Sequence, residues 1–114
     1  MDKAIEKKAG IVYYKRVGET FEGEWTHELT SGIRAREVVR EVGIGKVTGD
    51  WPVEIYGPDG EPYYSGTLSV ATLGQSLKLA WTGAFRQDGR QASFSGIGFA
   101  LDPDLIVATF EQTE

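Results

Sequence analysis

The chain has 114 residues, no cysteine and a formal net charge of −5 at pH 7. This length predicts one domain with its own core, which we place at residues 10–114 after a short N-terminal segment, residues 1–9. The lack of cysteine excludes disulfides and thiolate metal sites, and the acidic charge argues against binding to nucleic acid, which needs clustered Lys and Arg.

No part of the sequence predicts a membrane partner or a cofactor. Residues 1–8 are charged and lack the apolar centre of a secretory signal, and no apolar run is long enough to span a bilayer. We therefore expect a cytoplasmic protein. The glycines at 43–48 and 96–98 do not fit a phosphate loop or a dinucleotide fingerprint, so we expect no cofactor. A single histidine without cysteine leads us to expect no metal site.

Glycine and Pro-Asp turns divide the chain into eight segments with the length of long antiparallel strands. The first segment is 10–17. The second, 20–30, alternates most clearly, because Phe21, Trp25 and His27 share one face while glutamates occupy the other. This pattern is typical of a strand with one face in the core and one in water.

The segment 33–42 is compatible with two structures. Its alanine and valines are spaced as on one face of a helix, and the glycine that follows could cap that helix. As a strand, the segment would follow a three-residue loop, and Arg36 would face Glu28 while Arg40 faces Glu24. Such opposite-charge cross-strand pairs favour one register. The sequence leaves both possibilities open.

The next three segments, 46–56, 63–72 and 75–85, again alternate apolar and polar residues. Their apolar faces carry Trp51, Tyr64 and Trp81. Pro52 cannot donate a hydrogen bond to a neighbouring strand, so we expect it at a bulge or at an unpaired position.

The last two segments, 92–101 and 105–112, are apolar on both faces. A strand that is apolar on both faces is normally covered on both faces. In a closed barrel the outer face would need a cover from outside the sheet. We therefore predict a homo-oligomer that forms through these last two strands.

Together these segments predict an all-β fold, an antiparallel up-and-down β-barrel of about eight strands. Its interior would collect all three tryptophans. The residues predicted to line a small-molecule site are Phe21, Trp25, His27, Trp51, Tyr64 and Trp81. Glycines alternate with these rings along the same faces, which fits either a tightly packed core or an aromatic-walled cavity.

His27 and Glu37 are candidate catalytic residues. In the strand register described above, Glu37 lies opposite His27 inside the barrel. A carboxylate that orients an imidazole in a dry site is a common arrangement for general acid–base catalysis. The alternative is a buried histidine that is hydrogen-bonded by a neighbour and performs no chemistry.

Two short motifs resemble those of the calycin group, which comprises the lipocalin, fatty-acid-binding and avidin-type barrels. Gly23-Glu24-Trp25 and Gly49-Asp50-Trp51 are each similar to the Gly-x-Trp on an early strand of those barrels. Lipocalins also carry an arginine near the last strand that packs on this tryptophan, and the segment 105–112 contains none. The resemblance implies a calycin-like barrel that binds a small hydrophobic ligand in its interior.

The sequence therefore supports three functions. The first is binding of a small apolar or aromatic ligand inside the barrel. The second is a cofactor-free isomerase or cyclase that uses His27 and Glu37 to move protons. The third is an oligomeric interaction module that has no small-molecule site.

Overall fold

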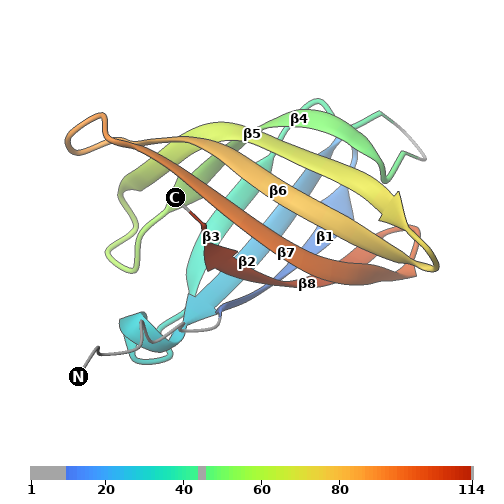
Figure 1. The fold of residues 1–114 in the computed structure, drawn as a ribbon, viewed down its shortest axis with the longest axis horizontal. Helices are drawn as coiled ribbons and strands as arrows, with labels where there is room; N and C mark the ends of the chain where they lie inside the picture. Colours follow the sequence, from blue (N-terminus) through green and yellow to red (C-terminus); the bar gives the residue numbers. More distant parts are fainter. Residues whose placement is uncertain (1–9, 44–45, 114) are drawn as a thin grey trace, which may run out of the picture.

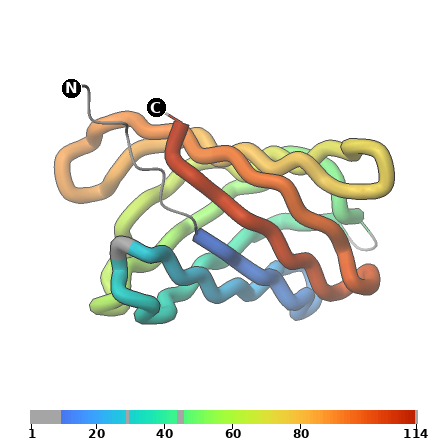
Figure 2. The backbone as a smooth tube through the Cα atoms, turned by 60° about the horizontal axis from the view of Figure 1, so that its bottom comes forward, coloured from blue at the N-terminus to red at the C-terminus, as the bar shows by residue number. Residues whose placement is uncertain are grey.

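The computed structural model describes residues 10–43 and 46–113, in which eight antiparallel strands form one closed barrel (Figure 1). The strands are β1 (Gly10–Val17), β2 (Thr20–His27), β3 (Ala35–Val39), β4 (Gly49–Tyr56), β5 (Pro62–Leu73), β6 (Ser76–Phe85), β7 (Gln91–Asp102) and β8 (Leu105–Gln112). Each strand pairs with its neighbours in sequence, and β8 pairs with β1 to close the barrel (Figure 2). The predicted all-β, up-and-down barrel is confirmed. The predicted N-terminal segment, residues 1–9, lies outside the described residues.

The up-and-down order places alternate turns at opposite ends of the barrel. The first end carries the β1–β2, β3–β4, β5–β6 and β7–β8 connections, and the second end carries the β2–β3, β4–β5 and β6–β7 connections. Gly18 and Gly74 adopt φ angles of 65° and 59° in the tight turns of the first end. Only glycine takes this left-handed conformation without a steric cost, which is why the breaks between strands were visible in the sequence.

Strand β2 ends at His27 and is shorter than predicted. The expectation of a strand through Thr30 is therefore wrong for its last residues. Glu28–Thr30 form a short 3-10 helix instead. The Thr30 hydroxyl donates to the carbonyl of His27 at 2.8 Å and accepts the His27 backbone N–H at 3.3 Å. These bonds end the strand at His27 by taking backbone groups that a longer ladder would use.

Residues 35–39 of the ambiguous segment form strand β3, so the helical alternative is wrong. The expected register is also wrong. Arg36 pairs with Glu24, and Glu37 pairs with Gly23 instead of His27. The connection from Glu28 to Arg34 has seven residues where three were expected, which moves the pairing by four positions. An even shift leaves every side chain on its predicted face.

The predicted charge pairing between β2 and β3 occurs with different partners. Arg34 lies 3.4 Å from Glu24, and Arg36 lies 3.6 Å from Glu22. All four side chains are well exposed to solvent. Ion pairs of this kind contribute little to stability, so they help to choose the register without holding the sheet together.

Strands β3 and β4 share the shortest ladder, which joins Glu37, Val38 and Val39 to Ile55, Glu54 and Val53. Pro52 lies just beyond it on this side, but on its other side it pairs with Thr67 of β5, so the expectation of a bulge or an unpaired position is wrong for the β4–β5 ladder. The Pro52 carbonyl accepts the backbone N–H of Arg40 at 3.0 Å. Because proline has no N–H to return that bond, the ladder ends there.

Glycines on the inner face bring neighbouring strands close together. Gly66 of β5 pairs with Gly83 of β6. A Cβ atom at Gly66 would lie 2.0 Å from the carbonyl oxygen of Thr82, and one at Gly83 would lie 2.1 Å from that of Ser65. The missing side chains at this pair therefore make room for backbone and for the bending of the sheet that closes the barrel. Within the described residues, no helix is long and apolar enough to cross a membrane.

Candidate functional site

The barrel interior gathers the aromatic residues that the sequence singled out. Trp25 and Trp51 are each 7% exposed and Trp81 is 2% exposed, so the three indole rings are buried in one core. Phe21 and Tyr64 are buried with them, whereas His27 is only half-buried. Five of the six predicted ligand-contact residues thus lie in one buried core, with His27 outside it, and the role of all six in binding remains a prediction.

A buried carboxyl group lies at the centre of this interior. Glu37 is 3% exposed and is the one charged side chain among the buried described residues. The Tyr14 hydroxyl and the Trp81 indole N–H both donate to its Oε2 atom, the latter at 2.8 Å. The three groups come from β1, β3 and β6, so the carboxyl links strands on different sides of the barrel.

Burial determines the protonation of this group. Removal from water raises the pKa of Glu37 from 4.5 to about 7, although the hydrogen bonds from Tyr14 and Trp81 act in the opposite direction. Burial together with the neighbouring carboxylate raises the pKa of Tyr14 well above its ordinary value. Burial also raises the pKa of Tyr64 to about 12, with a smaller effect from Glu37. Glu37 is therefore the group in this cluster that can gain or lose a proton near neutral pH.

Glu37 and His27 do not form the dyad that the sequence suggested. Glu37 faces Gly23, which precedes His27 by four residues, or roughly 13 Å along an extended strand. The His27 ring lies instead at the second end of the barrel, 5.7 Å from the ring of Phe110. The inward position of Glu37 was predicted correctly, but its partners Tyr14 and Trp81 were not. In the sequence, Tyr14 is only one of two adjacent tyrosines, and nothing there indicates its bond to Glu37.

Aromatic rings converge at the second end of the barrel. The cluster consists of Trp25, Tyr63, Tyr64, Phe85, Phe94 and Phe110. Tyr63 is 45% exposed and its ring stacks on Trp25, with a centroid separation of 6.5 Å and an interplanar angle of 19°. Phe94 and Phe110 are half-buried and meet edge to face at 6.3 Å. Apolar surface at this end is thus only partly withdrawn from water.

Trp25 also ties together two strands beside this cluster. Its indole N–H lies 3.2 Å from the carbonyl oxygen of Arg36 and 3.1 Å from that of Tyr56. These carbonyls belong to β3 and β4 where their short ladder has ended. The tryptophan of the Gly23-Glu24-Trp25 motif therefore satisfies backbone groups that the sheet leaves unpaired.

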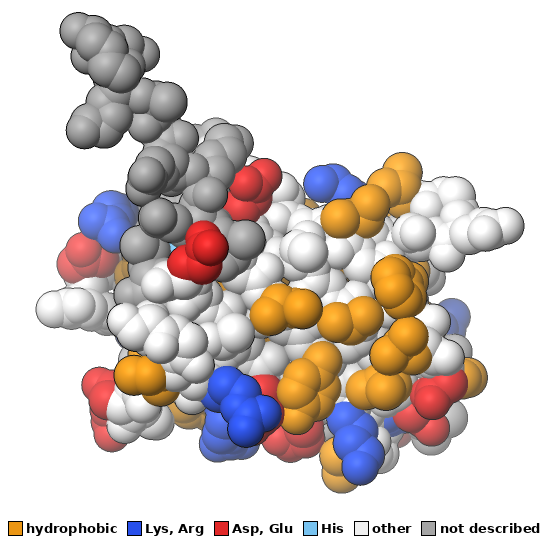
Figure 3. All heavy atoms as spheres, turned by 90° about the horizontal axis from the view of Figure 1, so that it is seen from below, with side chains coloured by type: hydrophobic (Ala, Val, Ile, Leu, Met, Phe, Trp, Pro, Cys, Tyr) orange, Lys and Arg blue, Asp and Glu red, His pale blue; other side chains and the backbone are white. Residues whose placement is uncertain are grey.

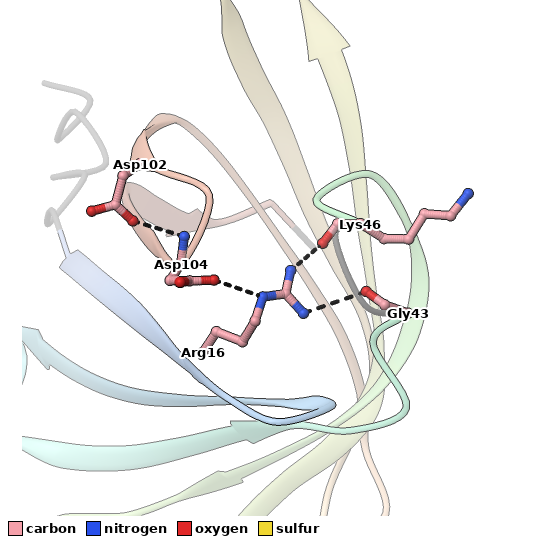
Figure 4. A network of polar contacts seen from close by, with 5 residues as sticks. All are labelled: Arg16, Gly43, Lys46, Asp102 and Asp104. Atoms are coloured by element: carbon pink, nitrogen blue, oxygen red, sulfur yellow. Dashed lines mark hydrogen bonds and ion pairs between the residues drawn. The ribbon is translucent and has the colours of Figure 1, made fainter.

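The first end of the barrel is held together by Arg16 (Figure 4). Its side chain is 10% exposed and its Nε atom lies 3.1 Å from Asp104. The same guanidinium donates to the carbonyl oxygens of Gly43 and Lys46, and it covers the ring of Phe21 at 4.7 Å. One cation therefore joins β1, the β3–β4 connection and the β7–β8 turn. No pattern in the sequence singled out this arginine of the first strand.

The described part of the chain contains no group of three or more His, Asp or Glu side chains that could hold a metal ion. Comparisons of the chain with protein families, with curated proteins and with solved structures found no match. The closed eight-stranded antiparallel barrel is compatible with calycin architecture.

Proposed function

We propose that this protein binds a small apolar or aromatic compound inside its barrel, between the ring cluster of the second end and Glu37. The observation that carries the proposal is the Glu37 carboxyl, buried at 3% exposure in an otherwise apolar interior. A buried carboxyl destabilises a protein unless it is compensated, and strongly perturbed carboxyls are concentrated at functional sites. As part of the same proposal, we place the protein in the calycin group of ligand-binding barrels.

The chemistry of the interior indicates which compounds would fit. Rings of Trp25, Phe94 and Phe110 offer faces and edges for stacking against a flat apolar body. Glu37 would accept a hydrogen bond from an N–H or O–H group of the ligand, in addition to the bonds from Tyr14 and Trp81. A ligand with one donor and an aromatic body therefore matches the site better than a fully polar one.

The two ends of the barrel differ in a way that supports entry at the second end. Arg16 ties three segments together across the first end. At the second end, Tyr63 is exposed and is held to Trp25 by ring stacking. Rotation of Tyr63 away from Trp25 would expose the cluster without breaking a ladder. The catalytic alternative receives no support from geometry, because His27 and Glu37 are not brought together.

The test uses N-phenyl-1-naphthylamine, a neutral fluorescent compound with two aromatic groups and one N–H donor. We expect saturable binding of one probe per chain, with quenching of tryptophan fluorescence. Glu37→Gln should weaken binding about tenfold, the effect of losing one charge-assisted hydrogen bond. Phe99→Ser is the matched control, because Phe99 is an aromatic residue of the outer face with 49% exposure.

The two variants distinguish a probe bound in the barrel interior from a probe bound on the outer surface. If Phe99→Ser abolishes binding and Glu37→Gln leaves it unchanged, the probe binds outside the barrel and the proposal is wrong. The same conclusion follows if the wild-type protein does not bind the probe at any pH between 6 and 9. Circular dichroism of each variant confirms that the barrel is folded.

A further inference from the structure

We propose that the outer face of β7, β8 and β1 binds the same face of a second copy of this chain, forming a two-fold symmetric dimer. The outer patch consists of Ile11, Tyr13, Ile97, Phe99, Leu101, Leu105 and Val107. Figure 3 shows hydrophobic side chains gathered on this side of the molecule, seen from below the view of Figure 1. This inference is independent of ligand binding, because the patch lies on the opposite face of the sheet from the interior.

The register of the sheet makes the patch continuous. Val107 of β8 pairs with Tyr13 of β1 on one side and with Phe99 of β7 on the other, so the three side chains form one row. Ile97 and Leu101 flank Phe99 on the same strand and are 50% and 59% exposed. Apolar side chains of three adjacent strands thus cover a single surface.

The polar atoms within the patch are already satisfied by the same chain. The Thr109 hydroxyl, which lies between Ile11 and Ile97, is 3.3 Å from both the backbone nitrogen and the carbonyl oxygen of Ile97. At the edge of the patch, the Tyr13 hydroxyl donates to Glu24 at 2.9 Å. The patch therefore needs no polar partner at its centre, which suits a dry contact between two sheets.

The size of the patch fits a dimer interface. With roughly 90 Å² for each of its five most exposed side chains, the patch presents about 450 Å² of apolar surface, within the range of roughly 300–600 Å² found for the largest apolar patch of a typical monomer. A standard interface covers about 800 Å² per partner, of which somewhat more than half is apolar. The apolar surface of the patch therefore corresponds to the apolar part of one standard interface.

Charges at the edge of the patch select a second copy as the partner. Lys15 of β1 and Asp102 of β7 both pair with Leu105 of β8, so they lie on opposite sides of one row. Both side chains are exposed. A two-fold axis parallel to β8 places β1 of each copy over β7 of the other. Lys15 then faces Asp102 of the partner subunit, and symmetry repeats the pair.

This arrangement agrees with the way sheets pack face to face. Two sheets stacked with an angle of about 30° between their strands keep side chains of the same row near one another. The alternative axis, perpendicular to the strands, would place Lys15 over Ile11 of the partner subunit and leave its charge without a partner. The geometry therefore favours the axis parallel to β8.

The first experiment is sedimentation velocity of the full chain from 1 to 100 µM. We expect a dimer in the wild type, and at least a tenfold higher dissociation constant in Phe99→Glu. Leu73→Glu is the matched control, because Leu73 is 48% exposed at the end of β5, away from the patch. A monomeric wild type at 100 µM overturns the proposal, as does a control that weakens the dimer equally.

The second experiment tests the two-fold axis through its charges. Lys15→Glu should weaken the dimer at least threefold, and the combination of Lys15→Glu with Asp102→Lys should restore it. Asp102→Asn separates the charge of Asp102 from its role in the turn. The Asp102 carboxylate also accepts the backbone N–H of Asp104 at 2.7 Å, and asparagine can keep this bond while removing the charge. Failure of the double variant to restore a dimer weakened by Lys15→Glu overturns the arrangement. Binding of a monomeric wild type to phosphatidylcholine vesicles would assign the patch to a lipid surface and would also overturn it.

Discussion

Replacing Glu37 by glutamine should stabilise the protein, and the gain should increase with pH. Glutamine keeps an acceptor oxygen for the Tyr14 hydroxyl and the Trp81 indole N–H, both of which donate to Glu37 in the wild type. Unlike glutamate, it carries no charge at any pH. The variant therefore removes the cost of an ionised carboxyl in the core while preserving its hydrogen bonds.

The size of the effect follows from the pKa of Glu37, which rises from 4.5 to about 7 in the folded chain. A raised carboxyl pKa means that the folded state binds the proton more tightly than the unfolded state. The stability that depends on a protonated Glu37 is therefore fully present below pH 4.5 and is lost as the pH rises through 7. The loss amounts to roughly 1 kcal/mol at pH 5.5 and roughly 3 kcal/mol at pH 8.5. The advantage of Glu37→Gln should grow by about 2 kcal/mol between these two values.

Urea denaturation of both proteins at several pH values between 5.5 and 8.5 measures this difference, and the range stays above the isoelectric point of about 4.9. Other titrating groups affect both proteins equally and cancel. Glu22→Gln serves as the control, because it makes the same replacement at a glutamate whose side chain is 46% exposed to water. A constant difference for Glu37→Gln would show that Glu37 does not change its protonation in this range, and would refute the reasoning.

Four further substitutions test the fold, each by urea denaturation. Gly83→Ala should cost about 3 kcal/mol or prevent folding, because its Cβ would lie 2.1 Å from the carbonyl oxygen of Ser65. Gly89→Ala, at a φ of 72° with no atom nearby, should cost only about 1 kcal/mol, and equal losses would contradict the close approach of β5 and β6. Trp25→Phe keeps the apolar ring but removes the N–H that bonds to Arg36 and Tyr56, so we expect a loss of about 1–2 kcal/mol; an unchanged stability would show that these bonds contribute nothing. Arg16→Met should cost about 2 kcal/mol and increase amide hydrogen exchange of Val42 and Lys46, which would stay protected if Arg16 did not hold the first end.

The fold could be predicted because most of the turns contain a glycine that adopts a left-handed conformation, and because strands such as β1 and β2 alternate buried residues with more exposed ones. Strand β1 has the bounds that were predicted, Gly10–Val17, and β8 has those of 105–112. The β2–β3 connection could not be predicted, since its length depends on the Thr30 bonds to His27. The resulting shift of four positions preserved the inward face of β3 and moved Glu37 away from His27.

The site was predicted in part, for a related reason. Alternation alone places Trp25, Trp51 and Trp81 on inward faces, and the structure buries all three. The partners of Glu37 depend on which residues meet across the barrel, and no local pattern in the sequence specifies contacts between β1, β3 and β6. Arg16 was missed because its burial comes from a carboxylate and two carbonyls that lie far away in sequence.

Native mass spectrometry with added N-phenyl-1-naphthylamine tests most directly whether the barrel interior is a ligand site. We predict one bound probe per chain for the wild type and for Phe99→Ser, and markedly reduced occupancy for Glu37→Gln. A wild-type protein without bound probe, or bound probe that is lost only in Phe99→Ser, would contradict the account.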